Sequence, residues 1–288
     1  MKLYTTIEPT PSRIHGLLHL ILNQKSPIRS QLELLFHPMN LRKSDETDAF
    51  QRVLNVLMDL ELVEEVTEGD DTILRANPDL GKASQLRERL PIVAARSALQ
   101  SEVGGQRNHF ARMCAWFLHQ PVTGIPQGHG AIKNQLEIAS QKTDWKFDVH
   151  LDNRLDMVIY WAKYLGLIAQ LRDERCRNLI ADPTRYLTRH LGLLLPSEET
   201  VPIRQFRQEL GKLCPVLDGG AIHEEVREVY EIERADNAMS PALGYALSRL
   251  EHQKLIKMER INDAPAHRIL IYNDEKITDV RRLSKGTS

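Results

Sequence analysis

The stretch that decides the fold occurs three times along the chain. Residues 53–63 (VLNVLMDLELV) place apolar side chains at helical spacing and end in an apolar pair, which indicates a helix that leads directly into a strand. The same arrangement returns at residues 158–168 (VIYWAKYLGLI) and at residues 246–256 (ALSRLEHQKLI). We therefore expect three units of similar local structure.

Each copy is followed by a polar stretch and by a second short apolar segment. These return segments are residues 73–78 (ILRANP), 178–183 (NLIADP) and 268–273 (RILIYN). A core-facing helix, a strand, a polar tip and a return strand form the second half of a winged helix. The sequence thus predicts a mainly α fold of three winged-helix units, each a helix-turn-helix with a β-hairpin wing, joined by linker helices.

The positions of the copies divide the 288 residues into units. Ser240-Pro241 marks the start of one repeated helix, because a cap residue is followed there by a proline at the first helical position. Residues 131–141 should be helical, and we expect no large or parallel sheet. The predicted divisions are a first unit in residues 1–80, a linker helix in 81–107, a second unit in 108–195, a third in 196–274 and a flexible basic tail in 275–288.

Composition restricts the class of protein. Hydrophobic residues at 42% and charged residues at 27% are ordinary for a globular protein. A net charge of −1 argues against a chain coated with basic residues for nucleic acid, although one basic face on a neutral body is compatible with it. The three cysteines are widely spaced, and neither a signal peptide nor an apolar run of membrane-spanning length occurs. We predict a cytoplasmic protein without a membrane partner.

Catalytic signatures are missing from the sequence. Residues 124–130 (GIPQGHG) contain the glycines of a phosphate-binding loop but lack its lysine and hydroxyl residue. His109, Cys114 and His119 are five residues apart, which turns successive side chains by about 140° around a helix and away from a shared metal ion. We predict no enzymatic activity, no cofactor and no metal site.

The third repeated helix has the outward face best suited to DNA. Leu243, Ala246, Leu247 and Leu250 should face the core, which leaves a polar, mildly basic face outside. Such a face in a winged helix enters the major groove. The alternative is a solvated face without a ligand. The predicted DNA-binding residues on this face and in the adjacent wing are Tyr245, Ser248, Arg249, His252, Arg260, His267 and Arg268.

The second repeated helix carries an aromatic cluster instead. Met157, Tyr160, Trp161 and Tyr164 occupy the equivalent outward positions, and such residues are enriched at protein interfaces. Packing against the chain's own helices is the alternative to a dimer contact. The following wing could still touch a phosphate through Arg172, Arg175 and Arg177.

The first unit is acidic around its wing. From position 45 to position 71 the only base is Arg52, and a phosphate backbone would repel such a segment. It either docks a basic partner or is a solvated acidic face. The predicted docking residues are Glu61, Glu64, Glu65, Glu68, Asp70 and Asp71.

The three copies resemble the tandem winged-helix proteins of bacteria in the Leu and Ile positions of each repeated helix, the Leu-Val or Leu-Ile strand entry and the return strand. The whole chain also resembles the winged-helix DpdG family, which is encoded in bacterial clusters for 7-deazaguanine DNA modification and restriction. That resemblance implies an accessory component that works beside helicases and nucleases, and not an enzyme on its own.

We therefore expect a non-enzymatic accessory protein of a bacterial multi-protein DNA-processing or phage-defence system. Its predicted partners are double-stranded DNA, other proteins of that system and a second copy of the chain in a homodimer. One alternative is a protein–protein adaptor like the winged-helix accessory subunits of SMC complexes, and another is a transcription regulator. The near-zero net charge favours the adaptor, whereas the polar-basic third face favours DNA binding.

Overall fold

The fold is mainly helical in the part of the chain that the structure describes. The computed structural model has eleven α-helices and five small sheets there, and every strand pairing is antiparallel. Residues 131–141 lie inside one helix, as the sequence predicts. Residues 9–36, 38, 49–103, 106–145, 147–171, 178–196, 200–235, 237–260, 267–269 and 275–283 are described, with the backbone alone for 103, 106–107, 267–269 and 275.

Two compact units make up the chain, where the sequence predicts three. One comprises Met1–Asn108 and Asp148–Tyr164, and the other comprises His109–Phe147 and Leu165–Ser288. The second repeated helix therefore belongs to the first unit, while the hairpin that follows it belongs to the second. Trp161 accounts for this assignment in part, because its indole Nε1 donates a hydrogen bond to the carbonyl of Pro9 at 3.0 Å.

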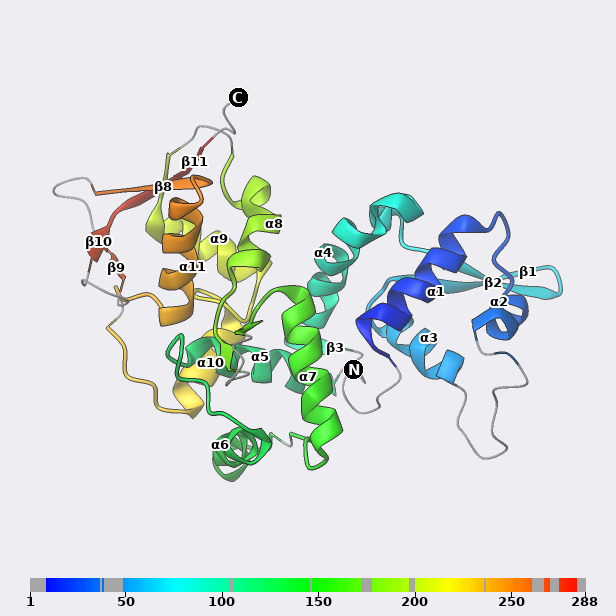
Figure 1. Cartoon of the computed structure of the whole chain (residues 1–288), viewed down its shortest axis with the longest axis horizontal. Helices are drawn as coiled ribbons and strands as arrows, with labels where there is room; N and C mark the ends of the chain where they lie inside the picture. The colour runs from blue at the N-terminus through cyan, green and yellow to red at the C-terminus, as the bar shows by residue number, and fades with distance from the viewer. Residues whose placement is uncertain are drawn as a thin grey trace. The chain divides into compact units, whose positions relative to one another are not determined.

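The first unit begins with a capped helix (Figure 1). The Thr10 hydroxyl accepts a hydrogen bond from the Arg13 amide, and Pro11 occupies the first turn. The apolar stripes of α1 and α3 are buried, as the 3.6-residue period predicts. Its helices and strands are α1 (Pro11–Asn23), α2 (Arg29–Phe36), α3 (Ala49–Asp59), β1 (Val63–Glu68), β2 (Asp71–Ala76), η2 (Pro78–Leu80), η3 (Ala83–Gln85), α4 (Leu86–Ala98), β3 (Glu102–Val103), β4 (Gln106–Arg107) and most of α7 (Asp152–Leu165).

The second unit is built around α11 (Pro241–His252), which contacts α5 and α8 and leads into β8 (Figure 1). Its core face is the predicted one, since Leu243, Ala246, Leu247 and Leu250 are buried. The remaining elements are α5 (His109–His119), α6 (His129–Lys142), β5 (Ala169–Gln170), β6 (Leu179–Ile180), α8 (Thr184–Leu194), β7 (Thr200–Pro202), α9 (Ile203–Leu213), α10 (Ala221–Val229), β8 (Ile256–Glu259), β9 (His267–Ile269), β10 (Glu275–Ile277) and β11 (Asp279–Arg282).

The three repeated motifs share the same turn between helix and strand. The ninth residue of each motif, namely Glu61, Gly166 or Lys254, has a positive φ of 56°, 88° or 57°. In the first and third copies the next amide bonds back to the helix, from Leu62 to Leu57 at 2.8 Å and from Leu255 to Leu250 at 2.9 Å. This is the hydrogen bond of a Schellman motif, which ends a helix and redirects the chain. The repeat in the sequence is therefore also a repeat in backbone geometry.

The third hairpin pairs differently from the sequence prediction. We expected the segment from residue 268 to return alongside β8, but β9 pairs with β10, and β8 pairs with β11. The resulting three-stranded sheet has the order β7-β11-β8. Burial explains why β11 occupies this place in the sheet, because Val280 of β11 is fully buried opposite Val201 of β7, which is also buried. Residues 275–277 and 279–282, which the sequence assigned to a flexible tail, are thus strands of two small sheets.

None of the described helices combines the length and the apolar composition that crossing a membrane requires.

The shared turn gives a test of the fold. Replacing Lys254 by glycine should raise the free energy of unfolding by up to about 1 kcal/mol, since glycine adopts a positive φ without the clash of a Cβ atom. The neighbouring Gln253 follows the last residue of α11 and has a φ of −75°, so glycine there should lower stability by about 0.4–1 kcal/mol, because it adds conformational entropy to the unfolded chain. Denaturant titrations followed by circular dichroism compare the two variants. Equal effects would contradict the turn geometry.

Candidate nucleic-acid interface

The outer face of α11 is polar and partly covered. The Ser240 hydroxyl caps the helix by accepting a hydrogen bond from the Leu243 amide at 3.1 Å. Tyr245 and Ser248 are half-buried, whereas His252 is exposed in the last turn. The face therefore offers hydrogen-bonding groups along the helix, as the sequence predicts.

Arg249 is held in place by two contacts within this unit. Its Nη1 forms an ion pair with Oδ2 of Asp182, and its guanidinium lies 5.6 Å from the centre of the Tyr245 ring. Asp182 is 5% exposed, while the Arg249 side chain remains 42% exposed. The Arg249 side chain is therefore open to solvent, whereas the carboxylate that it pairs with is buried.

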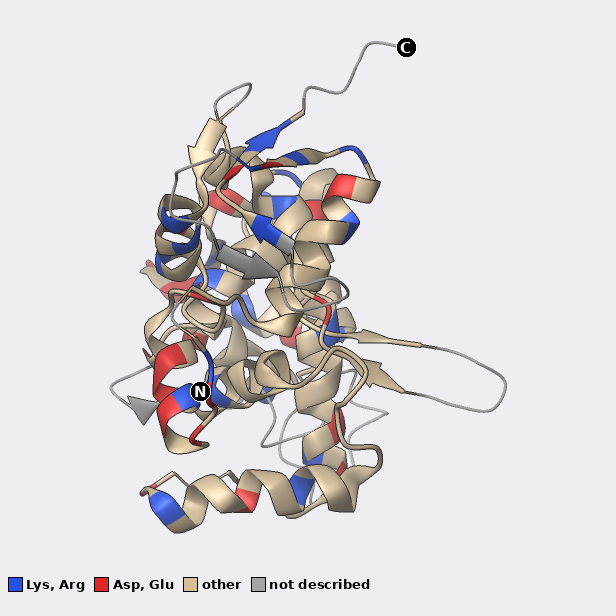
Figure 2. Cartoon of the chain, turned by 90° about the vertical axis from the view of Figure 1, so that its left-hand side faces the viewer, with Lys and Arg blue, Asp and Glu red and all other residues tan. Residues whose placement is uncertain are grey.

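The adjoining three-stranded sheet adds basic side chains. Lys257 of β8 lies opposite Arg281 of β11, and opposite residues in an antiparallel pair share a face. Both contact the same carboxylate, since Glu259 Oε1 is 3.2 Å from Lys257 Nζ and 3.2 Å from Arg281 Nε. Figure 2 shows lysine and arginine residues along this sheet at the end of the unit that carries the C-terminus.

The other predicted DNA contacts are less fully described. Arg260 is exposed directly after β8. His267 and Arg268 lie in β9, of which only the backbone is described. The secondary contacts predicted for the second wing lie outside the described residues, namely Arg172, Arg175 and Arg177.

A buried carboxylate anchors the start of α11. Asp218 is completely buried and accepts hydrogen bonds from the Ser240 amide at 2.7 Å and from the Ser240 hydroxyl. Arg234 and Arg207 approach the same carboxylate at 3.7 Å and 3.9 Å. Burial alone would raise the pKa of Asp218, but the two arginines and the Ser240 hydrogen bond lower it. The helix that carries the candidate interface is therefore fixed from within the core.

Two histidines complete this buried cluster. The rings of His119 and His223 have centres 3.9 Å apart, and His119 Nε2 bonds to the His223 carbonyl at 2.9 Å. Arg234 donates to His119 Nδ1 at 3.0 Å and to His223 Nε2 at 3.4 Å, so both of these nitrogens are acceptors and both rings are neutral. Burial lowers the pKa of His119 to about 4 and that of His223 to about 3.

The acidic hairpin of the first unit is partly neutralised by Arg75 of β2 and by Arg29 of α2. Arg75 lies 3.5 Å from Glu64 and 3.4 Å from Glu68, and Arg29 lies 3.2 Å from Glu65. The other predicted docking residue at its base, Glu61, is exposed and accepts a hydrogen bond from Ser97 at 3.4 Å.

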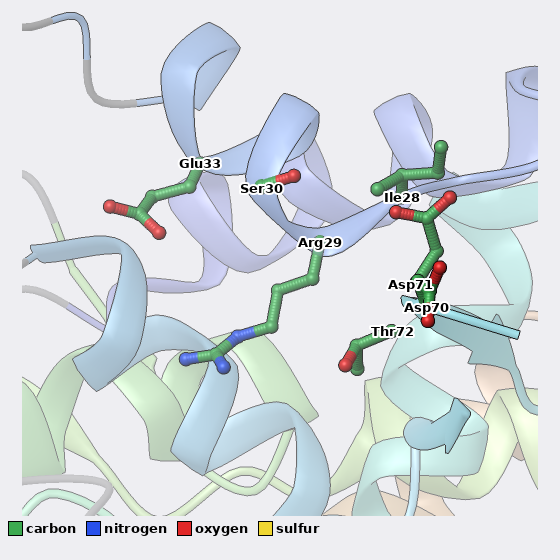
Figure 3. Close-up of a pocket in the computed structure, with 7 residues that line it drawn as sticks. All are labelled: Ile28, Arg29, Ser30, Glu33, Asp70, Asp71 and Thr72. Atoms are coloured by element: carbon green, nitrogen blue, oxygen red, sulfur yellow. The ribbon is translucent and has the colours of Figure 1, made fainter. Parts of the chain in front are cut away.

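A pocket of about 250 Å³ opens beside the tip of this hairpin. Asp70 and Asp71 line it, and no ion pair joins them to a base of the described residues. The Arg29 guanidinium extends away from these two aspartates (Figure 3). The pocket is therefore polar and acidic on the hairpin side. The remaining lining residues are Ile28, Arg29, Ser30, Glu33 and Thr72.

The aromatic cluster of α7 is mostly inside the protein. Trp161 is fully buried and Met157 is 5% exposed. Tyr164 is half-buried with its ring centre 5.7 Å from that of Trp161, whereas Tyr160 is 38% exposed. Packing within the chain accounts for Met157 and Trp161, so Tyr160 is the member best placed for contact with another protein.

Comparison with known families identifies the chain. The family model described as DpdG-like matches residues 1–264. The chain belongs to the DpdG-like family. No match was found among curated proteins or among solved structures. Within the described residues of this DpdG-like protein, no group of three or more His, Cys, Asp or Glu residues is arranged to hold a metal ion.

Several contacts at the candidate interface and in the core beneath it were not found by reasoning from the sequence. Asp182 precedes a proline and α8, which is a helix-start signal, but its partner Arg249 is 67 positions away. His119 was considered only with neighbours on its own helix, whereas it meets His223 across 104 positions. No local pattern predicts such pairs, because the packing of α8 against α11 creates the first and the packing of α5 against α10 creates the second.

The buried histidines predict a pH dependence of stability. Unfolded histidines protonate near pH 6.5, whereas folded His119 and His223 stay neutral down to about pH 4 and pH 3. Between these values the unfolded state binds more protons. The stability contributed by the pair should therefore be complete above pH 6.5 and should fall as the pH drops toward 4.

Unfolding titrations at pH 7 and pH 5 measure this effect. A His119→Asn/His223→Asn variant should lose less stability between the two pH values than the wild type. Exposed His252 provides the control, since His252→Gln should keep the wild-type dependence. A wild-type stability that does not change between pH 7 and pH 5 would contradict the buried neutral pair.

Proposed function

We propose that this DpdG-like protein is a non-enzymatic, DNA-binding accessory component of a bacterial multi-protein DNA-modification or phage-defence system. It acts in the cytoplasm, where it binds double-stranded DNA through the α11 unit and basic proteins through the acidic hairpin. Membership of the DpdG-like family supports the place in a DNA-modification system. The observation that carries DNA binding is Arg249, a half-exposed base on the polar face of α11, beside a sheet with further bases.

The topology of the second unit supports a winged helix. In chain order α8, β7, α9, α11, β8 and β11 correspond to the first helix, first strand, second helix, third helix and the two wing strands. The sheet order β7-β11-β8 places the first strand beside the last, which is the arrangement of such a wing. In this interpretation α10 is an insertion before the third helix.

The first unit follows the same order with a shorter first strand. Ile28, between α1 and α2, forms an isolated antiparallel bridge with Ile73 of β2. The Leu74 amide also bonds to the Pro27 carbonyl at 3.0 Å. Because α3 then leads into β1 and β2, the unit has each part of a winged helix. Two units of the same topology in one chain agree with a tandem arrangement.

Charge separates the roles of the two units. The α11 face and its sheet carry Arg249, Lys257, Arg260 and Arg281, which suit phosphate contacts. The hairpin of the first unit has Asp70 and Asp71 exposed at its tip, where DNA would be repelled and a basic protein attracted. This acidic tip also supports the adaptor alternative, in which proteins are the sole partners and a second copy contacts Tyr160.

Salt dependence tests the DNA interface. An Arg249→Ala/Arg268→Ala variant should bind a fluorescein-labelled duplex more weakly, and its slope of log affinity against log salt should fall by about 1.8, since each phosphate contact contributes about 0.9. Fluorescence anisotropy of the full chain at several salt concentrations measures this slope. No binding by the wild type at low salt would refute DNA binding and favour the adaptor; an unchanged slope in the variant would refute this interface.

The acidic hairpin provides the matched comparison. A Glu64→Gln/Glu65→Gln/Glu68→Gln variant should bind the same duplex with unchanged or slightly higher affinity, because its carboxylates repel phosphates and do not contact them. Fluorescence anisotropy under the same salt conditions measures the affinity of this variant. A weaker affinity in this variant would place DNA on the first unit and contradict the assigned roles.

A further inference from the structure

Asp182 occupies an unusual position for a carboxylate next to a candidate DNA-binding base. It lies between β6 and α8 and is 5% exposed. Its Oδ1 accepts hydrogen bonds from the Thr184 amide at 3.1 Å and from the Thr184 hydroxyl. Its Oδ2 faces Nη1 of Arg249 on α11. One oxygen therefore fixes the carboxylate to the start of α8, and the other is left for the arginine.

Arg249 is restrained along most of its side chain by this arrangement. Asp182 holds one end of the guanidinium, and the Tyr245 ring, one helical turn earlier, supports its plane. An arginine on an open helix face would lose its rotational freedom only when it binds a ligand. Here that freedom is already lost in the folded protein, so binding need not oppose it again.

The pair is also asymmetric in its exposure. Asp182 is buried, while Arg249 keeps 42% of its side chain accessible. A guanidinium has five N–H donors, and the described contacts of Arg249 use one of them for Asp182. The remaining donors are available to an acceptor outside the protein. Because the acid lies behind the base, an incoming anion meets the arginine first.

The position of Arg249 on the helix indicates which acceptor it meets. Recognition helices contact base edges through their N-terminal residues, whereas Arg249 lies in the last turn of α11. A residue at this end faces the sugar-phosphate backbone. A phosphate also accepts a planar arginine fork in two hydrogen bonds.

We propose that Asp182 is a positioning residue, which orients Arg249 over Tyr245 so that its free guanidinium edge binds a DNA phosphate. This role rests on the proposed DNA-binding function and adds a residue that contacts no DNA itself. Two effects oppose each other at this site. Removing the Asp182 charge lessens repulsion of DNA, and removing its hydrogen bond releases Arg249. In our proposal the second effect is the larger one.

Asp182→Asn separates these effects with little change in shape. The asparagine keeps a carbonyl oxygen for Thr184, but its amide group cannot accept from Arg249. Affinity for a labelled duplex should fall about three- to tenfold, the order expected when a long side chain must be immobilised on binding. In an Arg249→Ala background the same substitution should cause no further loss.

Two additional variants separate positioning from folding. Thr188→Val removes the hydrogen bond from its hydroxyl to the Thr184 carbonyl in the first turns of α8. It leaves every contact of Asp182 and Arg249 in place, so DNA affinity should not change. Arg249→Lys keeps the positive charge but not the planar guanidinium, so its affinity for DNA should fall. Adding Asp182→Asn to this variant should lower the affinity no further. Thermal unfolding of each variant shows whether the chain remains folded.

The outcomes distinguish this proposal from the function on which it rests. Absence of DNA binding by the wild type would refute DNA binding itself. Binding by the wild type that Asp182→Asn strengthens would show that the carboxylate competes with DNA, and binding that it leaves unchanged would show that Arg249 needs no support. If Asp182→Asn lowered DNA affinity equally in the wild type and in the Arg249→Ala variant, Asp182 would have only a structural role. Each of these results overturns the positioning role.

Discussion

The second unit depends on one buried carboxylate. Asp218 binds the amide and the hydroxyl of Ser240, the residue that caps α11, and is surrounded by Arg234, Arg207 and the His119–His223 pair. A buried charge is tolerated only where hydrogen bonds and opposite charges compensate its lost hydration. The cluster provides this compensation and so joins α5, α9, α10 and the start of α11. The orientation of the candidate interface follows from that requirement.

At the candidate interface, a second buried carboxylate is also bonded to the start of a helix and paired with an arginine. Asp182 is buried and bonded to the first turn of α8, and it holds Arg249 at the exposed end of α11. In the core the acid is enclosed by two arginines, whereas at the surface a single arginine covers it and remains open to solvent. The contacts of Asp218 fix the position of α11, and the contact of Asp182 fixes the position of the Arg249 side chain on that helix. This difference in exposure is why we assign a ligand to Arg249 and none to Arg234.

The two units differ in the charge of their β-structure. The hairpin β1–β2 carries more carboxylates than its neighbours Arg75 and Arg29 neutralise, and its tip aspartates line an open polar pocket. The sheet β7-β11-β8 has Lys257 and Arg281 on one face around a single Glu259. Because the hairpin is acidic and the sheet face is basic, the two units suit different partners. A component that brings proteins to DNA, as we propose for this DpdG-like protein, would need this separation.

The sequence by itself determined the three repeated helices, the strand that follows each of them and the buried face of α11, because these depend on residues a few positions apart. The motif of residues 53–63 and its two copies predicted a helix that leads directly into a strand, and at each of these junctions one residue, Glu61, Gly166 or Lys254, has a positive φ. Tertiary structure decided the partner of β8, since β11 contributes a single fully buried valine and competes with the more apolar segment around β9. It also decided the contacts of Trp161 with Pro9, His119 with His223 and Arg249 with Asp182. Such pairs join residues far apart in the chain, and only the packing of whole helices brings them within hydrogen-bonding distance.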